Sequence, residues 1–403
     1  MRTRRVIILG CTGSIGTQTI DAIRVLNAAA DAGRGETRFD IVGLAAGSNA
    51  GLLAQQATAL GVSQLALRNT DAHLEAPARR GERAAEQLVR EIDADIVVAA
   101  IVGIAGLGAT LAAVELGREV ALANKETLVA AGPLVVHAAE QSGARIFPVD
   151  SEHAAAWQCL RALPSCADAC PLTSPPPSLR RLTITASGGP FRNADTRTIA
   201  NATRDEALAH PNWSMGAKVT TDSATLINKA LELVEAHWLF GLTADRLGAV
   251  VHPQSTVHAF AELADGSVIA QLAAPDMRIA IAQAINGGLA PDTLQTDSAP
   301  AALDLAKLGS LEFEPVDTER FPGFTAWRRI VETGGTAGAC FNAANETAVE
   351  AFLAGRAPMS RIAETGLAAL ESHRSRPILT LDDVVTADAE GRAFAADRLG
   401  GIG

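Results

Sequence analysis

Residues 6–16 have the sequence VIILGCTGSIG and set the architecture of the N-terminal half of the chain. The apolar run from Val6 to Leu9 predicts a buried strand, and the glycines after it predict a tight turn into a helix. Glycines allow a backbone to approach a pyrophosphate closely, and the free N–H groups of the next helix face that anion. This order at the start of the chain indicates a dinucleotide-binding turn. The alternative is a strand-to-helix turn without a ligand.

Strands and helices alternate outward from this turn. We predict helices over 15–29 and 50–60, and strands over 39–46, 95–101, 119–123 and 145–149. The charge-free segment 96–114 is long enough to raise the question of a membrane span, but three glycines interrupt it, so we expect a buried strand, a turn and a helix and no membrane segment. The alternation is typical of an α/β fold whose N-terminal domain is a doubly wound, Rossmann-like parallel sheet.

The end of the second predicted strand favours NADPH as the cofactor. An NAD enzyme usually places Asp or Glu at this point, whereas this chain has Gly47, Ser48 and Asn49. A 2′-phosphate would meet no carboxylate there and could be bound by Ser48 and Asn49. After a later strand, residues 124–127 (NKET) lie where cofactor and substrate bind in this architecture, although Asn124 could also simply cap the next helix.

Composition excludes several classes of partner. The 403-residue chain has a net charge of -11, which opposes non-specific binding to nucleic acid. Tyrosine is absent and aromatic residues make up 4%, so a base-stacking platform is not expected either. Five scattered cysteines and an apolar run too short for a signal peptide favour reduced thiols and a cytoplasmic location.

Two carboxylates follow the last predicted strand of the first domain. In an extended backbone, residues two apart point the same way, so we expect Asp150 and Glu152 to face one point, with His153 beside them. Such a pair suits a hard cation but needs a third ligand. A polar strand end before a helix is the alternative.

The segment 221–235 supplies that third carboxylate. Its spacing predicts a helix with Asp222 or Ser223 as N-cap, on which Asn228, Glu232 and Glu235 share one face. A glutamate on a helix is usually a solvated surface residue. Here it lies with Ser, Asn and Lys in a mostly apolar helix, so a glutamate of this face can complete the cation site.

Two further segments indicate a site for a small phosphorylated ligand. A predicted strand over 181–186 leads into Ser187 and two glycines, which can bind a phosphate or form only a turn. The loop from His210 to Gly216 carries Trp213 and Met215 between polar residues, as expected of a lid that excludes water. Otherwise Trp213 is merely packed.

The remaining pattern divides the chain into four parts. Strands over 249–252, 257–262 and 267–272 predict a small sheet, and helices are expected over 342–353, 359–372 and 381–398. We therefore expect an NADPH-binding domain (1–150), a central α+β catalytic domain (151–290), a connector (291–318) and a C-terminal helical domain (319–403) with a packing role.

Taken in order, these motifs resemble the 1-deoxy-D-xylulose 5-phosphate reductoisomerase family. The match includes the glycine turn, 123–126 (ANKE), 148–153 (PVDSEH), 187–191 (SGGPF), 210–216 (HPNWSMG) and 222–229 (DSATLINK), and runs from residue 6 to Asn345-Glu346. The resemblance implies conversion of 1-deoxy-D-xylulose 5-phosphate to 2-C-methyl-D-erythritol 4-phosphate in isoprenoid biosynthesis. The implied chemistry is a retro-aldol cleavage and re-addition followed by reduction with NADPH, in a homodimer.

The resemblance also implies roles for individual residues. The implied ligands of Mg²⁺ or Mn²⁺ are Asp150, Glu152 and Glu232. The implied substrate-binding and catalytic residues are Lys125, Ser151, Glu152, His153, Ser187, His210, Trp213, Ser223, Asn228, Lys229 and Glu232, with His258 as a neighbour. The implied cofactor-binding residues are Thr12, Gly13, Ser14, Ile15, Gly47, Ser48, Asn49, Asn124, Glu126 and Gly216.

Two other classes of protein remain open from the sequence. A semialdehyde dehydrogenase has a similar glycine turn but needs an activated cysteine, and Cys159 lies within a helix pattern. An inactive NADP-binding module would need none of the three carboxylates. The sequence also contains a Pro-, Ser- and Cys-rich segment over 165–178 to which we assign no function.

Overall fold

The first sheet is built around β1 (Arg2–Leu9). The structure, a computed structural model, describes residues 1–211, 213, 215–289 and 302–400. β1 pairs in parallel with β2 (Thr37–Ala46) on one side and with β5 (Ile96–Ala99) on the other. The sheet has seven strands in the order β4-β3-β2-β1-β5-β6-β7, and each neighbouring pair is parallel. The strand order reverses at β1, so a crevice for a ligand opens at the carboxyl end of this strand.

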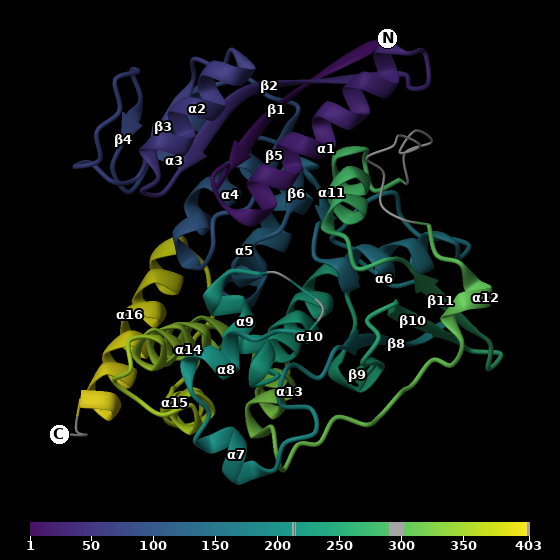
Figure 1. The fold of residues 1–403 in the computed structure, drawn as a ribbon, viewed down its shortest axis with the longest axis vertical. Helices are drawn as coiled ribbons and strands as arrows, with labels where there is room; N and C mark the ends of the chain where they lie inside the picture. Colours follow the sequence, from purple (N-terminus) through teal and green to yellow (C-terminus); the bar gives the residue numbers. More distant parts are fainter. Residues whose placement is uncertain (212, 214, 290–301, 401–403) are drawn as a thin grey trace.

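The glycine turn lies at that end of the sheet, between β1 and α1 (Ser14–Asp31), and the strand order confirms the doubly wound architecture (Figure 1). The other elements of this region are, in chain order, α2 (Ala50–Leu60), β3 (Leu65–Leu67), β4 (Arg79–Arg80), α3 (Ala84–Glu91), the 3-10 helix η1 (Ile104–Gly106), α4 (Leu107–Glu115), β6 (Glu119–Leu122), α5 (Lys125–Ser142) and β7 (Arg145–Pro148).

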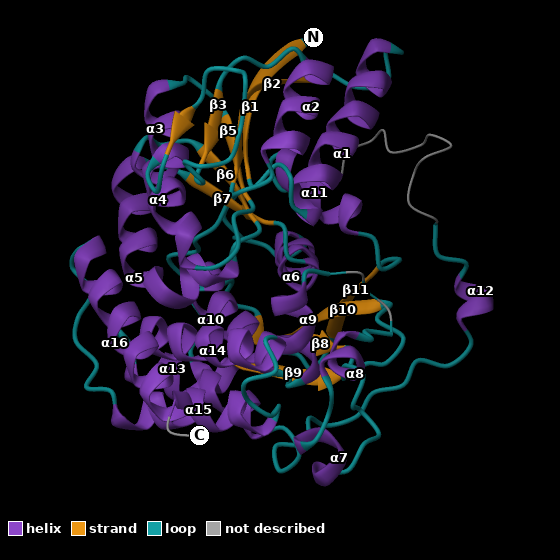
Figure 2. Cartoon of the chain, turned by 60° about the vertical axis from the view of Figure 1, so that its left-hand side comes forward, coloured by secondary structure: helices purple, strands orange, loops and turns teal. Residues whose placement is uncertain are grey.

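Helices cover both faces of this sheet, and alternate side chains of β1 pack against the helices on opposite faces. Val6 and Ile8 belong to the apolar cluster that includes side chains of α1, α2 and α11 (Met277–Ile285), whereas Ile7 and Leu9 belong to the cluster that includes α3, α4 and α5. Figure 2 shows these two helix layers on opposite sides of the strands. All four side chains are fully buried, which is why this strand is a continuous apolar run.

Most predicted elements of this region are present. The charge-free segment 96–114 forms β5, η1 and most of α4. No helix among the residues that the structure describes is long and apolar enough to cross a membrane. The short strands β3 and β4 escaped prediction because strands of two or three residues leave no periodic pattern, and β4 consists of Arg79 and Arg80 alone.

The central region contains a second, smaller sheet. Its order is β11-β10-β8-β9, in which β10 is antiparallel to both neighbours and β8 is parallel to β9. The predicted strands are therefore confirmed as members of one small sheet. The elements are α6 (Ser151–Arg161), β8 (Leu179–Ala186), α7 (Thr196–Ala200), α8 (Arg204–Leu208), α9 (Ala217–Ala224), α10 (Ile227–Phe240), η2 (Ala244–Arg246), β9 (Leu247–Val251), β10 (Val257–Leu263) and β11 (Val268–Leu272).

Two local predictions in this region are wrong. The backbone after β7 is not extended through Glu152: α6 begins at Ser151, and Asp150 is its N-cap, with its side chain accepting a hydrogen bond from the Glu152 N–H. Asp222 and Ser223 do not cap the glutamate helix either. They lie inside α9, and the chain turns at Leu226, whose φ of +57° is left-handed, before α10 begins.

The C-terminal helices pack on α5 and α10 (Figure 1). They are α13 (Ala326–Thr333), α14 (Ala337–Leu353), α15 (Ser360–Ser372) and α16 (Leu381–Gly400), preceded by α12 (Leu305–Leu308) and η3 (Pro322–Thr325). Part of the predicted connector, 291–301, lies outside the described residues. α11, which follows the small sheet in the chain, packs against α1 and so returns to the first sheet.

Candidate active site

One cavity of about 440 Å³ lies between the two sheets, at the carboxyl end of β1. The structure brings most predicted site residues to its wall. These are Gly13, Ser14, Ile15, Lys125, Asp150, Ser151, Glu152, Ser187, His210, Trp213, Gly216, Ser223, Asn228, Lys229 and Glu232. The other predicted residues, all within the described part of the chain, lie outside this wall: Thr12, Gly47, Ser48, Asn49, Asn124, Glu126 and His153.

Three carboxylates converge on one side of the cavity. Asp150 and Glu152 come from the start of α6, and Glu232 comes from α10. One oxygen of each lies within 4.8 Å of the others. Three carboxylate oxygens at this spacing match the donor set that Mg²⁺ and Mn²⁺ prefer, so the residues fit a hard divalent cation. The N-cap geometry of Asp150, rather than an extended backbone, brings the first two together.

Two buried ammonium groups balance these carboxylates. Lys125 Nζ lies 2.7 Å from Asp150 Oδ2 and 2.8 Å from Glu232 Oε1, and Lys229 Nζ lies 2.6 Å from Glu152 Oε1. Lys229 also contacts the second oxygen of Glu232. Burial alone would lower the pKa of Lys125, but Asp150 and Glu232 hold it well above its ordinary value. Both lysines are therefore charged, and each bridges two of the three carboxylates.

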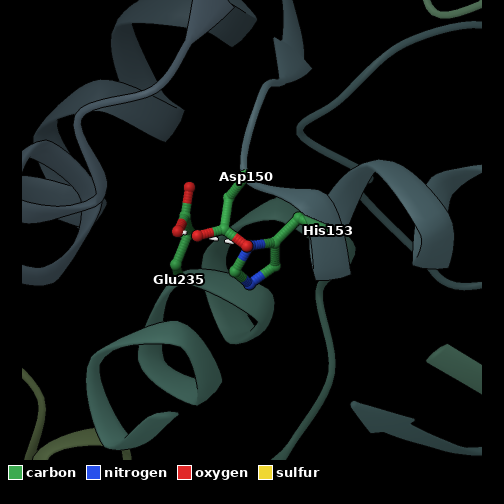
Figure 3. A group of neighbouring side chains, drawn as sticks. All are labelled: Asp150, His153 and Glu235. Carbon is green, nitrogen blue, oxygen red and sulfur yellow. Dashed lines mark ion pairs between the residues drawn. The ribbon is translucent and has the colours of Figure 1, made fainter. Parts of the chain in front are cut away.

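His153 lies behind the carboxylates and does not line the cavity. Its Nδ1 is 3.1 Å from Asp150 Oδ1 and 3.3 Å from Glu235 Oε2 (Figure 3). Its Nε2 is 2.8 Å from the backbone oxygen of Glu232. Burial opposes the charged form, but Glu235 and Asp150 raise the pKa of His153 to about 9. Burial also raises the pKa of Glu235 to about 7, against the effect of His153. The imidazole thus ties α6 to α10.

The opposite wall is suited to a small anion. Ser187 leads into Gly188 and Gly189, whose φ values of +86° and +65° favour glycine. Ser187 Oγ lies 3.1 Å from His210 Nε2, and the Trp213 N–H donates to His210 Nδ1. Nδ1 is therefore the acceptor, which leaves Nε2 to donate to Ser187. Burial lowers the pKa of His210, in keeping with this neutral form.

The cofactor side of the site starts at the glycine turn. Gly13 is the N-cap of α1, and no side chain caps this helix, so its first N–H groups face the cavity end of the turn. Gln56 Nε2 donates to the Cys11 carbonyl at 2.9 Å and fixes the turn from behind. Gly47, Ser48 and Asn49 lie exposed at the end of the neighbouring strand β2, at the same sheet edge.

Two residues predicted to bind the cofactor, Asn124 and Glu126, make contacts within the fold. The Asn124 side chain accepts from the Thr127 N–H as the N-cap of α5 and donates to the carbonyls of Ile101 and Gly103. The capping alternative for Asn124 is thus confirmed. Glu126 is buried and pairs with Lys218 at 2.6 Å.

The cavity wall also contains residues that the sequence did not reveal. Lys218, Ser255 and Met277 line it, and His258, expected only as a neighbour, lies in it too. Ser255 and Met277 carry no local motif, so only their position in the fold places them here. A signal for Lys218 did exist, since lysine is rare in this chain.

Cysteine chemistry is not supported by the geometry. Cys159 is buried in α6, and burial raises the pKa of its thiol to about 11. It is absent from the cavity wall, as far as the described residues show. A thiol of this kind is not a nucleophile at neutral pH, which removes the semialdehyde dehydrogenase alternative.

The fold and the site together define a dinucleotide-binding oxidoreductase with an acidic centre suited to a divalent cation. Residues 6–132 match the family described as 1-deoxy-D-xylulose 5-phosphate reductoisomerase, and residues 146–240 and 272–394 match its two C-terminal domains. The enzyme of that name from Bordetella avium is 44% identical over 408 residues, covering 98% of each chain. The one from Gloeobacter violaceus is 44% identical and covers 96% of each chain. The chain belongs to the 1-deoxy-D-xylulose 5-phosphate reductoisomerase family.

Solved structures of the same family share the whole fold. A crystal structure of DOX-P reductoisomerase in complex with NADPH, fosmidomycin and magnesium superposes with a TM-score of 0.87, at 36% identity and 98% coverage of both chains. The Zymomonas mobilis enzyme in complex with NADPH gives a TM-score of 0.83, at 35% identity and 99% coverage of both.

Proposed function

We propose that this protein converts 1-deoxy-D-xylulose 5-phosphate to 2-C-methyl-D-erythritol 4-phosphate, using NADPH and a divalent cation. The observation that carries the proposal is that Asp150, Glu152 and Glu232 meet Lys125 in the same cavity that the glycine turn enters. An inactive dinucleotide-binding module would not need a buried cluster of carboxylates and ammonium groups. The relatives that carry this name, and the related structures with NADPH and magnesium, support the same reaction.

The carboxylate cluster prepares the substrate for rearrangement. Asp150, Glu152 and Glu232 hold Mg²⁺ or Mn²⁺, which supplies Lewis-acid polarisation of the sugar's carbonyl and hydroxyl oxygens when bound. Lys125 lies between Asp150 and Glu232, where its ammonium group stabilises negative charge that develops on the sugar. Ser151 adjoins this cluster and orients the sugar. His153 contributes from behind, by holding Asp150 in place.

The phosphate end of the sugar lies between Ser187 and the start of α10. Ser187, Ser223, Asn228 and Lys229 bind the phosphate in this proposal. Asn228 donates to Glu232, and Lys229 pairs with Glu152 and Glu232, so in this proposal both side chains exchange partners when substrate binds. His210 contacts the sugar, and Trp213 and Met215 form the flap that excludes water.

Residues 1–150 bind NADPH at the carboxyl edge of the first sheet. The cofactor lies along Thr12 to Ile15, Gly47 to Asn49 and Gly216, with Asn124 and Glu126 shaping the floor beneath it. A carbon–carbon bond of the sugar breaks and re-forms between different carbons, and the resulting aldehyde accepts hydride from NADPH. Residues 151–290 provide the metal and substrate site, and the chain works as a homodimer in the cytoplasm.

Glu232→Gln tests the metal assignment. The change keeps the side-chain shape but removes a negative charge from the cluster, so we expect Mn²⁺ affinity to fall roughly 100-fold. NADPH oxidation with 1-deoxy-D-xylulose 5-phosphate should fall at least as much. The two measurements are steady-state kinetics and calorimetric titration with Mn²⁺.

Glu86→Gln serves as the matched control. Glu86 is a partly buried carboxylate on α3 that pairs with Arg83 and Arg90, outside the cavity. Its replacement should leave Mn²⁺ binding and turnover unchanged. An unaltered rate in Glu232→Gln would show that Glu232 is not a ligand.

A further inference from the structure

Lysine is scarce in this chain, and its distribution is informative. Lysine and arginine together number 34, of which only four are lysines. Lys125, Lys218 and Lys229 line the cavity, whereas Lys307 lies on the exposed helix α12. Since arginine provides almost every other cation, these three positions indicate sites where a compact ammonium group is needed. Lys125 and Lys229 pair with the carboxylate cluster, whereas Lys218 pairs with other carboxylates.

Lys218 joins two buried carboxylates from different elements. Its Nζ lies 2.6 Å from Glu126 Oε1 and 3.1 Å from Asp222 Oδ2. The carboxylates are 5% and 1% exposed, so the ammonium group is their main charge compensation. Burial alone would lower the pKa of Lys218, but Asp222 and Glu126 raise it above its ordinary value. The contact is therefore a charged, buried clamp between α5 and α9.

Each end of this clamp lies next to a residue of the site. Glu126 follows Lys125 in the first turn of α5, and Asp222 precedes Ser223 in α9. Lys218 itself lies in the first turn of α9, directly after the flap that ends at Gly216. A displacement of the clamp would thus move the central lysine of the carboxylate cluster, a phosphate-binding serine and the flap.

The clamp is held from behind on both sides. Asn345 Nδ2 in α14 donates to Asp222 Oδ1 at 2.9 Å. Asn124 Nδ2 donates to Glu126 Oε2 at 3.2 Å and also to the carbonyl of Ile101, in the loop after β5. That loop contributes Ala100 and Val102 to the cavity wall. A continuous hydrogen-bonded path therefore connects the cofactor side of the cavity, through Lys218, to the substrate side.

We infer that Lys218 is a positioning residue that fixes α9 to α5 and thereby couples binding of the nicotinamide cofactor to binding of the phosphorylated ligand. This inference rests on the proposed function. With the clamp closed, a cofactor that orders the loop after β5 also orders Ser223 and the first turn of α9. Without the ammonium group, the two sides of the cavity bind their ligands independently.

The experiment measures this coupling directly. Fosmidomycin, which is bound with NADPH and magnesium in the related crystal structure, serves as a non-reacting probe. Its Kd is determined by calorimetry in Mg²⁺, with and without saturating NADPH, for the unmodified protein, Lys218→Met and the control Lys307→Met. We expect NADPH to tighten fosmidomycin binding about tenfold or more in the unmodified protein and the control, and to leave it almost unchanged in Lys218→Met.

The ratio of the fosmidomycin Kd without NADPH to that with NADPH distinguishes a positioning role of Lys218 from a purely structural one. A merely structural lysine would weaken both complexes equally and keep the ratio, and that result would overturn the inference. The inference would also be overturned if NADPH left the fosmidomycin Kd of the unmodified protein unchanged. If Lys218→Met does not fold, Lys218→Gln, whose amide can still donate to Asp222, gives the same ratio test. Failure of the unmodified protein to bind either ligand would instead contradict the proposed function.

Discussion

Lys125 shows how closely charge is balanced at single residues of this site. It begins α5, after strand β6 of the first sheet, yet its ammonium group contacts Asp150 and Glu232, which belong to the start of α6 and to α10. Burial and the charge of Asp150 raise the pKa of Glu232, whereas Lys125 and His153 keep the pKa of Asp150 well below its usual range against the effect of burial. Asp150 and Glu232 are thus unequal, and a divalent cation would favour the ionised form of both.

His258 gives a pH test at the same scale. Burial lowers its pKa to about 4, so the folded protein keeps this imidazole neutral while the unfolded chain, with an ordinary pKa of about 6.5, takes up a proton. The unfolded state therefore binds more protons between about pH 6.5 and 4, and the stability contributed by neutral His258 is lost as the pH falls through that range. The loss amounts to about 2 kcal/mol between about pH 7 and 5.

We expect His258→Asn to reduce this acid sensitivity. The thermal unfolding midpoint of the metal-free variant should fall less between about pH 7 and 5 than that of the unmodified protein. An equal fall in both proteins would mean that His258 is not kept neutral by its surroundings.

At the residue scale, motifs identified the chemistry but not the contacts. Asp150, Glu152 and Glu232 could be predicted because few residue types bind hard cations. The ion pairs of Lys229 with Glu152 and of Lys218 with Glu126 could not, because each joins residues more than 75 positions apart in the chain.

Among the elements, the glycine turn after β1 has the strictest steric demands. A methyl group at Gly16 would collide with the backbone of Gly10 and Cys11, and Gly10 itself has a φ of +79°. The turn can therefore close only with glycine at these positions, which is why it was readable from the sequence.

Gly16→Ala should damage both folding and cofactor binding. We expect a loss of roughly 1–3 kcal/mol in stability from overpacking and NADPH affinity at least about tenfold weaker, because the N–H groups of α1 are displaced. Thermal unfolding and fluorescence titration with NADPH measure the two effects.

Gly51→Ala is the control for that experiment. Gly51 lies in the first turn of α2, where the nearest atom to an added methyl is 4.0 Å away. Alanine there should be neutral or stabilise the helix by up to about 1 kcal/mol. If the two substitutions had equal effects, the turn would not have the tight geometry described.

Other elements were predictable only in part. The break between α9 and α10 falls at Leu226, a residue that rarely adopts φ of +57°, and nothing in the local pattern signals it. The start of α6 at Ser151 was missed because Asp150 was interpreted as part of a strand, although aspartate is also a strong N-cap. Both errors changed the expected local geometry without changing which residues meet.

In the whole molecule, the parts expected from the sequence share one core. A single apolar cluster contains Leu9 of the first sheet, Leu182 of the second and Phe341 of the C-terminal helices. α11, although it follows the small sheet in the chain, buries Ile281 and Ile285 with β1. The class of each region could be predicted from its periodicity. The packing of the regions against one another could not be predicted. The surfaces that they share are apolar on both sides, and no sequence pattern indicates which apolar surface packs on which.

That packing explains why the site lies where it does. The glycine turn belongs to the first sheet, the three carboxylates come from α6 and α10, and Ser187 and Ser223 come from the end of β8 and from α9. Asn345 of the C-terminal helices supports Asp222. The C-terminal helices, expected only to pack, thus hydrogen-bond to Asp222, the neighbour of Ser223 in the cavity wall. The account as a whole requires all these regions to act in one reaction.

The most direct test combines the purified protein with 1-deoxy-D-xylulose 5-phosphate, NADPH and Mg²⁺, follows NADPH oxidation, and identifies the product by NMR. We expect one 2-C-methyl-D-erythritol 4-phosphate per NADPH oxidised, loss of activity with a chelator, recovery with Mg²⁺ or Mn²⁺, and a slower rate with NADH. NADPH oxidation that does not need the sugar phosphate, or turnover that a chelator leaves unchanged, would contradict the account.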